Sequence, residues 1–161
     1  MMEKVYSYMN RLLEGVIAIL MGFIVILMFS EVVSRYFFRA PIIWSEEMAT
    51  YAFIWIIYIG SGVAFYRHAH IRVDYFSLKW SPGTMKRVEL GLNLIMAFFF
   101  LFLLITGMKF AFPNFHVDSY TLPVIKLGWI YVAVPLGALL MLCNVARNLY
   151  LIYYQEKSGP E

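Results

Sequence analysis

The sequence predicts an all-α integral membrane protein with four transmembrane helices and short interfacial amphipathic segments. Hydrophobic residues make up 62% of the 161 residues and charged residues only 14%, whereas soluble domains are roughly half apolar and about a quarter charged. The charges lie between four uncharged runs, 15–30, 48–66, 90–108 and 127–146, and a helix needs about 20 apolar residues to cross a bilayer. These runs lack the alternation of barrel strands, so we expect helices.

We expect one membrane domain over residues 1–161, with spans near 12–34, 46–66, 87–109 and 127–147. The first run is the shortest, but apolar residues on both sides lengthen it. The N-terminal segment contains Glu3 and Glu14, and no small-x-small cleavage site follows. We therefore expect the first span to be retained rather than removed as a signal peptide.

Basic residues are unevenly divided among the connecting segments. The N-terminal segment, the central loop 67–86 with the adjacent Arg87, and the C-terminal tail hold nine lysines and arginines. The other two loops, with the helix ends beside them, hold four. The positive-inside rule therefore places both termini and the central loop in the cytoplasm, and loops 35–45 and 110–126 outside. The net charge of +3 is ordinary for such a protein and gives no reason to expect nucleic acid as a partner.

The loops carry interfacial signals. In the central loop, apolar residues alternate with basic ones, and Tyr75 and Trp80 suit the level of the lipid headgroups. We expect this loop to lie along the cytoplasmic membrane surface. Ser81 and Pro82 are a suitable N-cap and first residue for the third helix. Pro41 is expected to prevent the first helix from continuing.

Three charged residues near the end of span one form the first candidate group. Glu31, Arg35 and Arg39 are spaced four residues apart, so one helical face could carry a ladder of charges. Two interpretations stay open, namely local pairing at the membrane interface and a polar contact to another subunit.

Two adjacent glutamates at the start of span two form the second group. With Ser45 as N-cap, Glu46 and Glu47 fall in the first helical turn, where they complement the helix dipole. A contact to a partner protein is the alternative. Catalysis is not expected, because neighbouring residues point about 100° apart on a helix and no nucleophile or metal ligand accompanies them.

The histidines give no metal or cofactor site. His68 and His70 are two residues apart, so they share a face only on a strand, and Asp74 is the nearest further ligand. All three histidines of the chain lie in loops, whereas haem ligands normally lie within facing spans. The single Cys143 forms no metal-binding spacing. We expect no cofactor and no metal in this chain.

Span four and span two contain features that affect helix packing. Pro135 should kink span four, and Gly137 should permit a close helix contact, as should Gly60 and Gly62 in span two. Spans two and four have no ionisable residue between their ends. A solute pathway needs polar groups or unwound backbone at the midplane. The sequence therefore favours an accessory or scaffold subunit, and not an enzyme.

Two segments carry a resemblance to a known family. Residues 34–74 resemble the small membrane subunit of TRAP (tripartite ATP-independent periplasmic) transporters, and the segment "LPVIKLGWIYVAVPLG" is similar to the last helix of that family. Thr50 departs from the pattern, since many members have a basic residue there. The matching residues are Trp44, Ser45, Glu46, Glu47, His70, Ile71, Val73, Asp74, Pro123, Tyr131, Pro135 and Gly137.

The resemblance implies a role in a bacterial or archaeal cytoplasmic (inner) membrane. In such transporters a large multi-span membrane subunit holds the substrate and sodium sites and moves as an elevator. The small subunit packs beside it as scaffold, in contact with membrane lipids, and its outward loops could meet the periplasmic substrate-binding protein. Substrates in the family are organic acids, including C4-dicarboxylates and sialic acids, and sodium is expected in the partner subunit. The alternatives are a self-sufficient four-helix exporter and the membrane anchor of a redox complex.

Overall fold

The computed structural model describes residues 2–68 and 82–157, and these residues form an all-α membrane protein as predicted. The helices are α1 (Met2–Phe37), α2 (Ser45–His68), α4 (Pro82–Ala111), α5 (Leu127–Tyr131) and α6 (Ala133–Lys157), with a 3₁₀ turn η1 (Pro113–His116). The third long helix begins at Pro82, where its fixed φ angle suits the first helical position.

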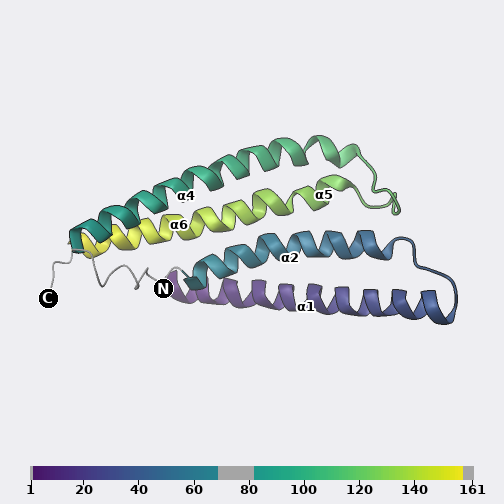
Figure 1. Ribbon diagram of the computed structural model, residues 1–161. Coiled ribbons are helices and arrows are strands. Elements are labelled where there is room, and N and C mark those ends of the chain that lie inside the picture. Colours follow the sequence, from purple (N-terminus) through teal and green to yellow (C-terminus); the bar gives the residue numbers. More distant parts are fainter. Residues whose placement is uncertain (1, 69–81, 158–161) are drawn as a thin grey trace.

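The long helices lie side by side in the order α1, α2, α6, α4 (Figure 1). α1 packs against α2, α2 against α6, and α6 against α4. This arrangement is an open layer, because the two outer helices do not close on each other. The burial of the most apolar window of each span agrees, with 39% buried in the span of α6 but 11% in α1 and 6% in α4. Both edges of the layer therefore present apolar surface.

The structure has four helices long and apolar enough to cross a membrane, as the sequence predicts. These candidate spans are Tyr6–Phe37, Ser45–Phe65, Arg87–His116 and Leu127–Tyr150. α1 has 36 residues, which corresponds to about 54 Å at the helical rise per residue. It is longer than the expected span 12–34 because the helix continues into the flanking polar segments, and a bilayer core about 30 Å thick accommodates such a helix by tilt or by projection.

The contact between α2 and α6 depends on two glycines. A Cβ atom on Gly137 would lie 2.8 Å from Tyr58 Cβ, and one on Gly62 would lie 2.9 Å from Leu140 Cβ. Beside them, Asn144 Nδ2 donates a 3.1 Å hydrogen bond to the Gly62 carbonyl. Gly60 differs from expectation, since a Cβ there would make only an ordinary 3.8 Å contact with Ile17. Small residues thus bring these two backbones close together, as is common in membranes.

Pro135 divides the last span into two helices. Its nitrogen carries no hydrogen, so it cannot bond to the carbonyl of Tyr131, and its ring crowds that carbonyl. α5 ends at Tyr131 and α6 begins at Ala133, so the interruption falls where the missing bond predicts. Gly107 of α4 lies opposite, and a Cβ there would be 3.0 Å from Pro135 Cδ.

Candidate functional site

The connections α1 to α2 and α4 to α5 lie at one end of the layer, which we call the loop end (Figure 1). It comprises residues 38–44 and 112–126, and most of the candidate residues lie in or beside it. His70 and Asp74 lie outside the described residues.

The end of α1 separates Arg39 from the expected ladder of charges. The helix stops at Phe37, and Arg39 adopts a left-handed conformation with φ of 54°. This conformation lets the Ala40 N–H return to the Ser34 carbonyl at 3.2 Å, a common way to end a helix. The prediction of a three-membered ladder is therefore wrong at Arg39, because that residue no longer follows the helical spacing.

Glu31 and Arg35 form the part of the ladder that does exist. Arg35 Nε donates a 2.8 Å hydrogen bond to Glu31 Oε1, and the Glu31 side chain is buried. Arg35 Nη2 also lies 3.6 Å from Glu46 Oε1 on α2. Glu31 is therefore paired locally, within its own helix. Arg35 extends this pairing to Glu46 in the first turn of α2.

Ser45 does not cap α2 as expected, because it is the first residue of the helix. Its hydroxyl donates a 2.7 Å hydrogen bond to the Ile42 carbonyl, and its side chain is fully buried. The preceding residue, Trp44, supplies the carbonyl that accepts the Met48 N–H at 3.1 Å. Ser45 therefore stabilises the turn that leads into the helix, while Glu46 and Glu47 lie in the first turn as predicted.

Glu47 binds the loop between α4 and α5. Its Oε1 accepts hydrogen bonds from the Ser119 hydroxyl at 2.6 Å and the Tyr120 N–H at 3.1 Å. Its Oε2 accepts the Thr121 N–H at 2.8 Å. The hydroxyls of Tyr51 and Thr121 also donate to this carboxylate. Both oxygens are thus occupied by donors of the same chain, and the carboxylate fixes residues 119–121 against α2.

The same loop is braced from within. The Ser119 N–H donates to the Ile125 carbonyl at 2.9 Å, and the Leu127 N–H donates to the Val117 carbonyl at 3.0 Å. Asp118 and Lys126 form an isolated antiparallel bridge and an ion pair. Residues 117–127 therefore form a short hairpin-like unit, and Glu47 attaches this unit to the helical layer.

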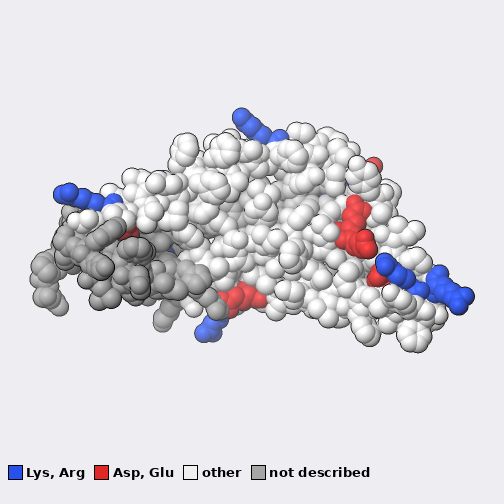
Figure 2. Space-filling view, in the orientation of Figure 1, with Lys and Arg blue, Asp and Glu red and all other residues white. Residues whose placement is uncertain are grey.

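Glu46 differs from Glu47 in its exposure and in its contacts. Its side chain is 79% exposed, and its contact with Arg35 is long. In Figure 2, acidic and basic side chains gather at the loop end beside a wide surface without charges. The two adjacent glutamates therefore have separate roles, because Glu47 is used within the chain and Glu46 remains open to another molecule.

The other candidates are distributed differently. Trp44 lies at the loop end and is exposed. Tyr131 ends α5, and its ring packs edge-on against Phe110 with centroids 4.9 Å apart. Pro135 and Gly137 lie inside the layer, where they shape helix packing.

Sequence reasoning missed Tyr51, Ser119 and Thr121. Only Tyr51 had a usable signal, since it lies four residues after Glu47 on the same helix face. Within residues 2–68 and 82–157, no group of three or more His, Cys, Asp or Glu residues could hold a metal ion.

Comparison with known proteins identifies the family. The family described as "Tripartite ATP-independent periplasmic transporters, DctQ component" matches residues 24–153. This chain belongs to that family. The DctQ family consists of transporter subunits, which confirms that the chain is not an enzyme, and its four candidate spans make it a multi-pass membrane protein.

Three relatives illustrate the range of the DctQ family. The chain is 23% identical over 149 residues to the sialic acid TRAP transporter small permease protein SiaQ of Vibrio cholerae, covering 92% of this chain and 86% of that protein. It is 28% identical over 105 residues to the C4-dicarboxylate TRAP transporter small permease protein DctQ of the same species. This alignment covers 65% of this chain and 45% of that protein. It is 29% identical over 157 residues to the sialic acid TRAP transporter permease protein SiaT of Haemophilus influenzae, covering 94% of this chain but only 24% of SiaT.

Proposed function

We propose that this chain is the small scaffold subunit of a sodium-coupled TRAP transporter that takes up an organic acid with a periplasmic binding protein. The observation that carries the proposal is the match to the DctQ component over residues 24–153. The names of the relatives indicate the class of substrate, since two are sialic acid proteins and one is a C4-dicarboxylate protein.

The match to SiaT supports a large membrane partner. Nearly the whole chain aligns with SiaT, yet the aligned part is 24% of that protein. In SiaT, a region similar to this chain is therefore covalently joined to a much longer remainder. We infer that the counterpart of this remainder is a separate large subunit here, and that it contains the substrate and sodium sites.

The distribution of ionisable residues supports a scaffold role. The runs 15–30, 48–66, 90–108 and 127–146 contain no Asp, Glu, Lys or Arg. An ion or organic acid that crosses a membrane needs polar groups near the midplane. A static support for the moving part of a partner needs packed helices and apolar edges, and the described helices pack in one layer whose outer spans are little buried.

The edge formed by α1 offers a surface for the large subunit. Ile19 and Phe29 are 73% and 70% exposed. A Cβ on Gly15 or Gly22 would meet no atom within 4 Å, so a partner helix could approach the backbone closely. One exposed stripe recurs at spacings of three, four or seven residues, which places it on one face: Tyr8, Leu12, Gly15, Ile19, Gly22, Ile26, Phe29 and Tyr36.

The loop end offers a surface for soluble contacts. Glu47 holds the 117–127 unit in place, and Tyr120 at its tip is 95% exposed. Glu46, with Arg39 nearby in sequence, adds open charges at the same end. With the orientation that the basic residues predict, this end faces the periplasm and the binding protein.

Purification from native membranes tests the proposed assembly. An affinity-tagged full chain, extracted in mild detergent, should copurify with one large multi-span membrane protein that mass spectrometry identifies. Recovery of the tagged chain alone or as a homodimer, from membranes in which the large protein is present, would contradict the proposal and favour the self-sufficient exporter.

A further inference from the structure

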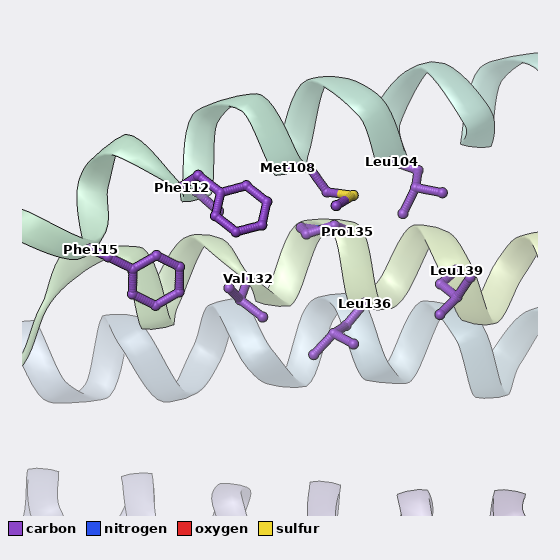
Figure 3. Close-up of a pocket in the computed structure, with 9 residues that line it drawn as sticks. Leu104, Met108, Phe112, Phe115, Val132, Pro135, Leu136 and Leu139 are labelled. Carbon is purple, nitrogen blue, oxygen red and sulfur yellow. The ribbon is translucent and has the colours of Figure 1, made fainter.

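An apolar cavity opens between α4 and α6 near the loop end (Figure 3). Its volume is about 270 Å³. In Figure 3, Met108 and Leu104 approach it from α4, Phe112 and Phe115 close one end, and Leu139 lies at the other. The lining residues are Leu104, Met108, Ala111, Phe112, Phe115, Val132, Pro135, Leu136 and Leu139.

The cavity lies beside a close helix contact and beside the interruption of the last span. Gly107 and Pro135 bring α4 and α6 close together beside the cavity, while the interruption at Val132 changes the course of the last span. Pro135 thus lines the cavity close to the point where the last span is interrupted.

The surroundings determine what can enter the cavity. All nine lining residues are apolar, so a carboxylate, an ion or water would lose its hydrogen bonds inside. The cavity lies on the candidate spans Arg87–His116 and Leu127–Tyr150, so it borders the hydrocarbon of the bilayer. At about 270 Å³ the space is large enough for several methylene groups of a hydrocarbon chain.

A cation and three exposed aromatic rings lie on the two spans beside the cavity. Lys109 follows the lining residue Met108 and is exposed, and no residue within 2–68 and 82–157 pairs with it. It lies one helical turn before Phe112, which places it on the flank of the same face. Phe110, Phe112 and Trp129 are each about 60% exposed, and tryptophan is typical of an interfacial belt.

We propose that this cavity binds one acyl chain of a phospholipid from the leaflet at the loop end, with the lipid phosphate at Lys109. The lining supplies the apolar contact, and Lys109 supplies the charge that matches the phosphate. The bound chain fills the space beside the Pro135 break, so it supports the packing of α4 against α6.

Photolabelling of the full chain in lipid nanodiscs tests this site. The probe is phosphatidylglycerol with a diazirine in mid-chain, and mass spectrometry maps the labelled peptides. We expect saturable labelling concentrated in 104–115 and 132–139. The matching diazirine diacylglycerol, which has the same chains without phosphate, should label these segments about five-fold less, as the loss of one lysine–lipid charge contact predicts.

Variants of the lining, of an exposed control position and of Lys109 identify the contacts. Leu136→Trp should fill the cavity and lower labelling of both segments at least about five-fold, and Leu139→Phe serves the same purpose if Leu136→Trp does not fold. Leu94→Trp adds the same ring at an exposed position of α4 outside the cavity lining and should leave labelling unchanged. Lys109→Gln should reduce labelling by phosphatidylglycerol to the diacylglycerol level, while Lys109→Arg should retain it.

Several results would overturn the proposal. Labelling spread evenly over the exposed faces of α1 and α4, or unchanged in Leu136→Trp, means that no chain is bound in the cavity. Normal phosphatidylglycerol labelling in Lys109→Gln overturns the phosphate contact. Loss of labelling when the chain is assembled with a membrane partner assigns the cavity to a protein side chain instead of a lipid.

Discussion

The Glu47 carboxylate on α2 accepts a 2.8 Å hydrogen bond from the backbone N–H of Thr121, 74 residues later in the chain. A single side chain thus joins the start of one span to the loop that enters another. Because Ser119 and Tyr51 also donate to Glu47, the connection is a small network and not one isolated contact. It fixes the position of the 117–127 unit at the loop end.

Removing the Glu47 carboxylate should release this unit. In Glu47→Ala, the Ser119 hydroxyl, which is buried, loses its charged acceptor, and this costs about 1–2 kcal/mol of local stability. Amide hydrogen exchange at 117–127 should therefore accelerate roughly tenfold for each 1.4 kcal/mol. Glu47→Gln should have a smaller effect, because one acceptor oxygen remains while the amide nitrogen faces N–H donors.

Glu46→Ala is the matched control for that experiment. Its side chain makes no contact with the 117–127 unit in the described structure and is largely exposed. Exchange at 117–127 should stay at the wild-type rate. Equal acceleration in Glu46→Ala and Glu47→Ala would mean that both glutamates act through the helix dipole, and the specific Glu47 network would be refuted.

The exposed glutamate should matter for assembly and not for the fold. We expect Glu46→Ala to change the free energy of unfolding by less than about 0.5 kcal/mol, as is usual for a surface position. Recovery of the large membrane subunit or of the binding protein in copurification should fall. Wild-type recovery of both would remove Glu46 from the partner contacts and leave it as a charge near the α2 terminus.

The close contact of α2 with α6 predicts a sharp difference between two glycines. Gly137→Ala would place a Cβ 2.8 Å from Tyr58 Cβ, and such overpacking costs about 1–3 kcal/mol. Gly22→Ala meets no atom within 4 Å and should not destabilise the isolated chain. Thermal unfolding in detergent measures both. A Gly137→Ala variant as stable as wild type would show that α2 and α6 are not in close contact.

The open edge of α1 predicts a variant that affects the complex alone. Gly22→Leu adds a large side chain to the exposed stripe, so it should leave the unfolding temperature of the chain unchanged but block close approach of a partner helix. Copurification with the large subunit should drop several-fold. Gly91→Leu on α4, where a Cβ also meets no atom within 4 Å, is the control. Loss of assembly in Gly91→Leu but not in Gly22→Leu would move the interface to the α4 edge.

Most of the fold follows from patterns that are local in sequence. Uncharged runs predict the spans, and Pro135 predicts the interruption of the last one, since both depend on neighbouring residues alone. The end of α1 is harder to predict from the sequence, because it depends on the left-handed conformation of Arg39. This conformation is uncommon for a residue other than glycine. The open order α1, α2, α6, α4 depends on contacts between distant segments and has no local signal.

The candidate site also has contacts that the local sequence predicts and contacts that it does not. The Glu31–Arg35 pair follows from four-residue spacing on one helix. The separate roles of Glu46 and Glu47 do not follow from their sequence, because adjacent identical residues differ only in which way each points on the folded helix. Ser119 and Thr121 are more than 70 residues from Glu47, so only the three-dimensional structure brings them together.

Uptake by a reconstituted transporter tests the central proposal most directly. Proteoliposomes would contain the large subunit with or without this chain, and the binding protein would carry radiolabelled sialic acid or a C4-dicarboxylate under an inward sodium gradient. We predict sodium-dependent uptake of one of these acids only when the large subunit and this chain are both present, and none with this chain alone. Uptake driven by this chain alone, or full uptake by the large subunit without it, would contradict the scaffold role.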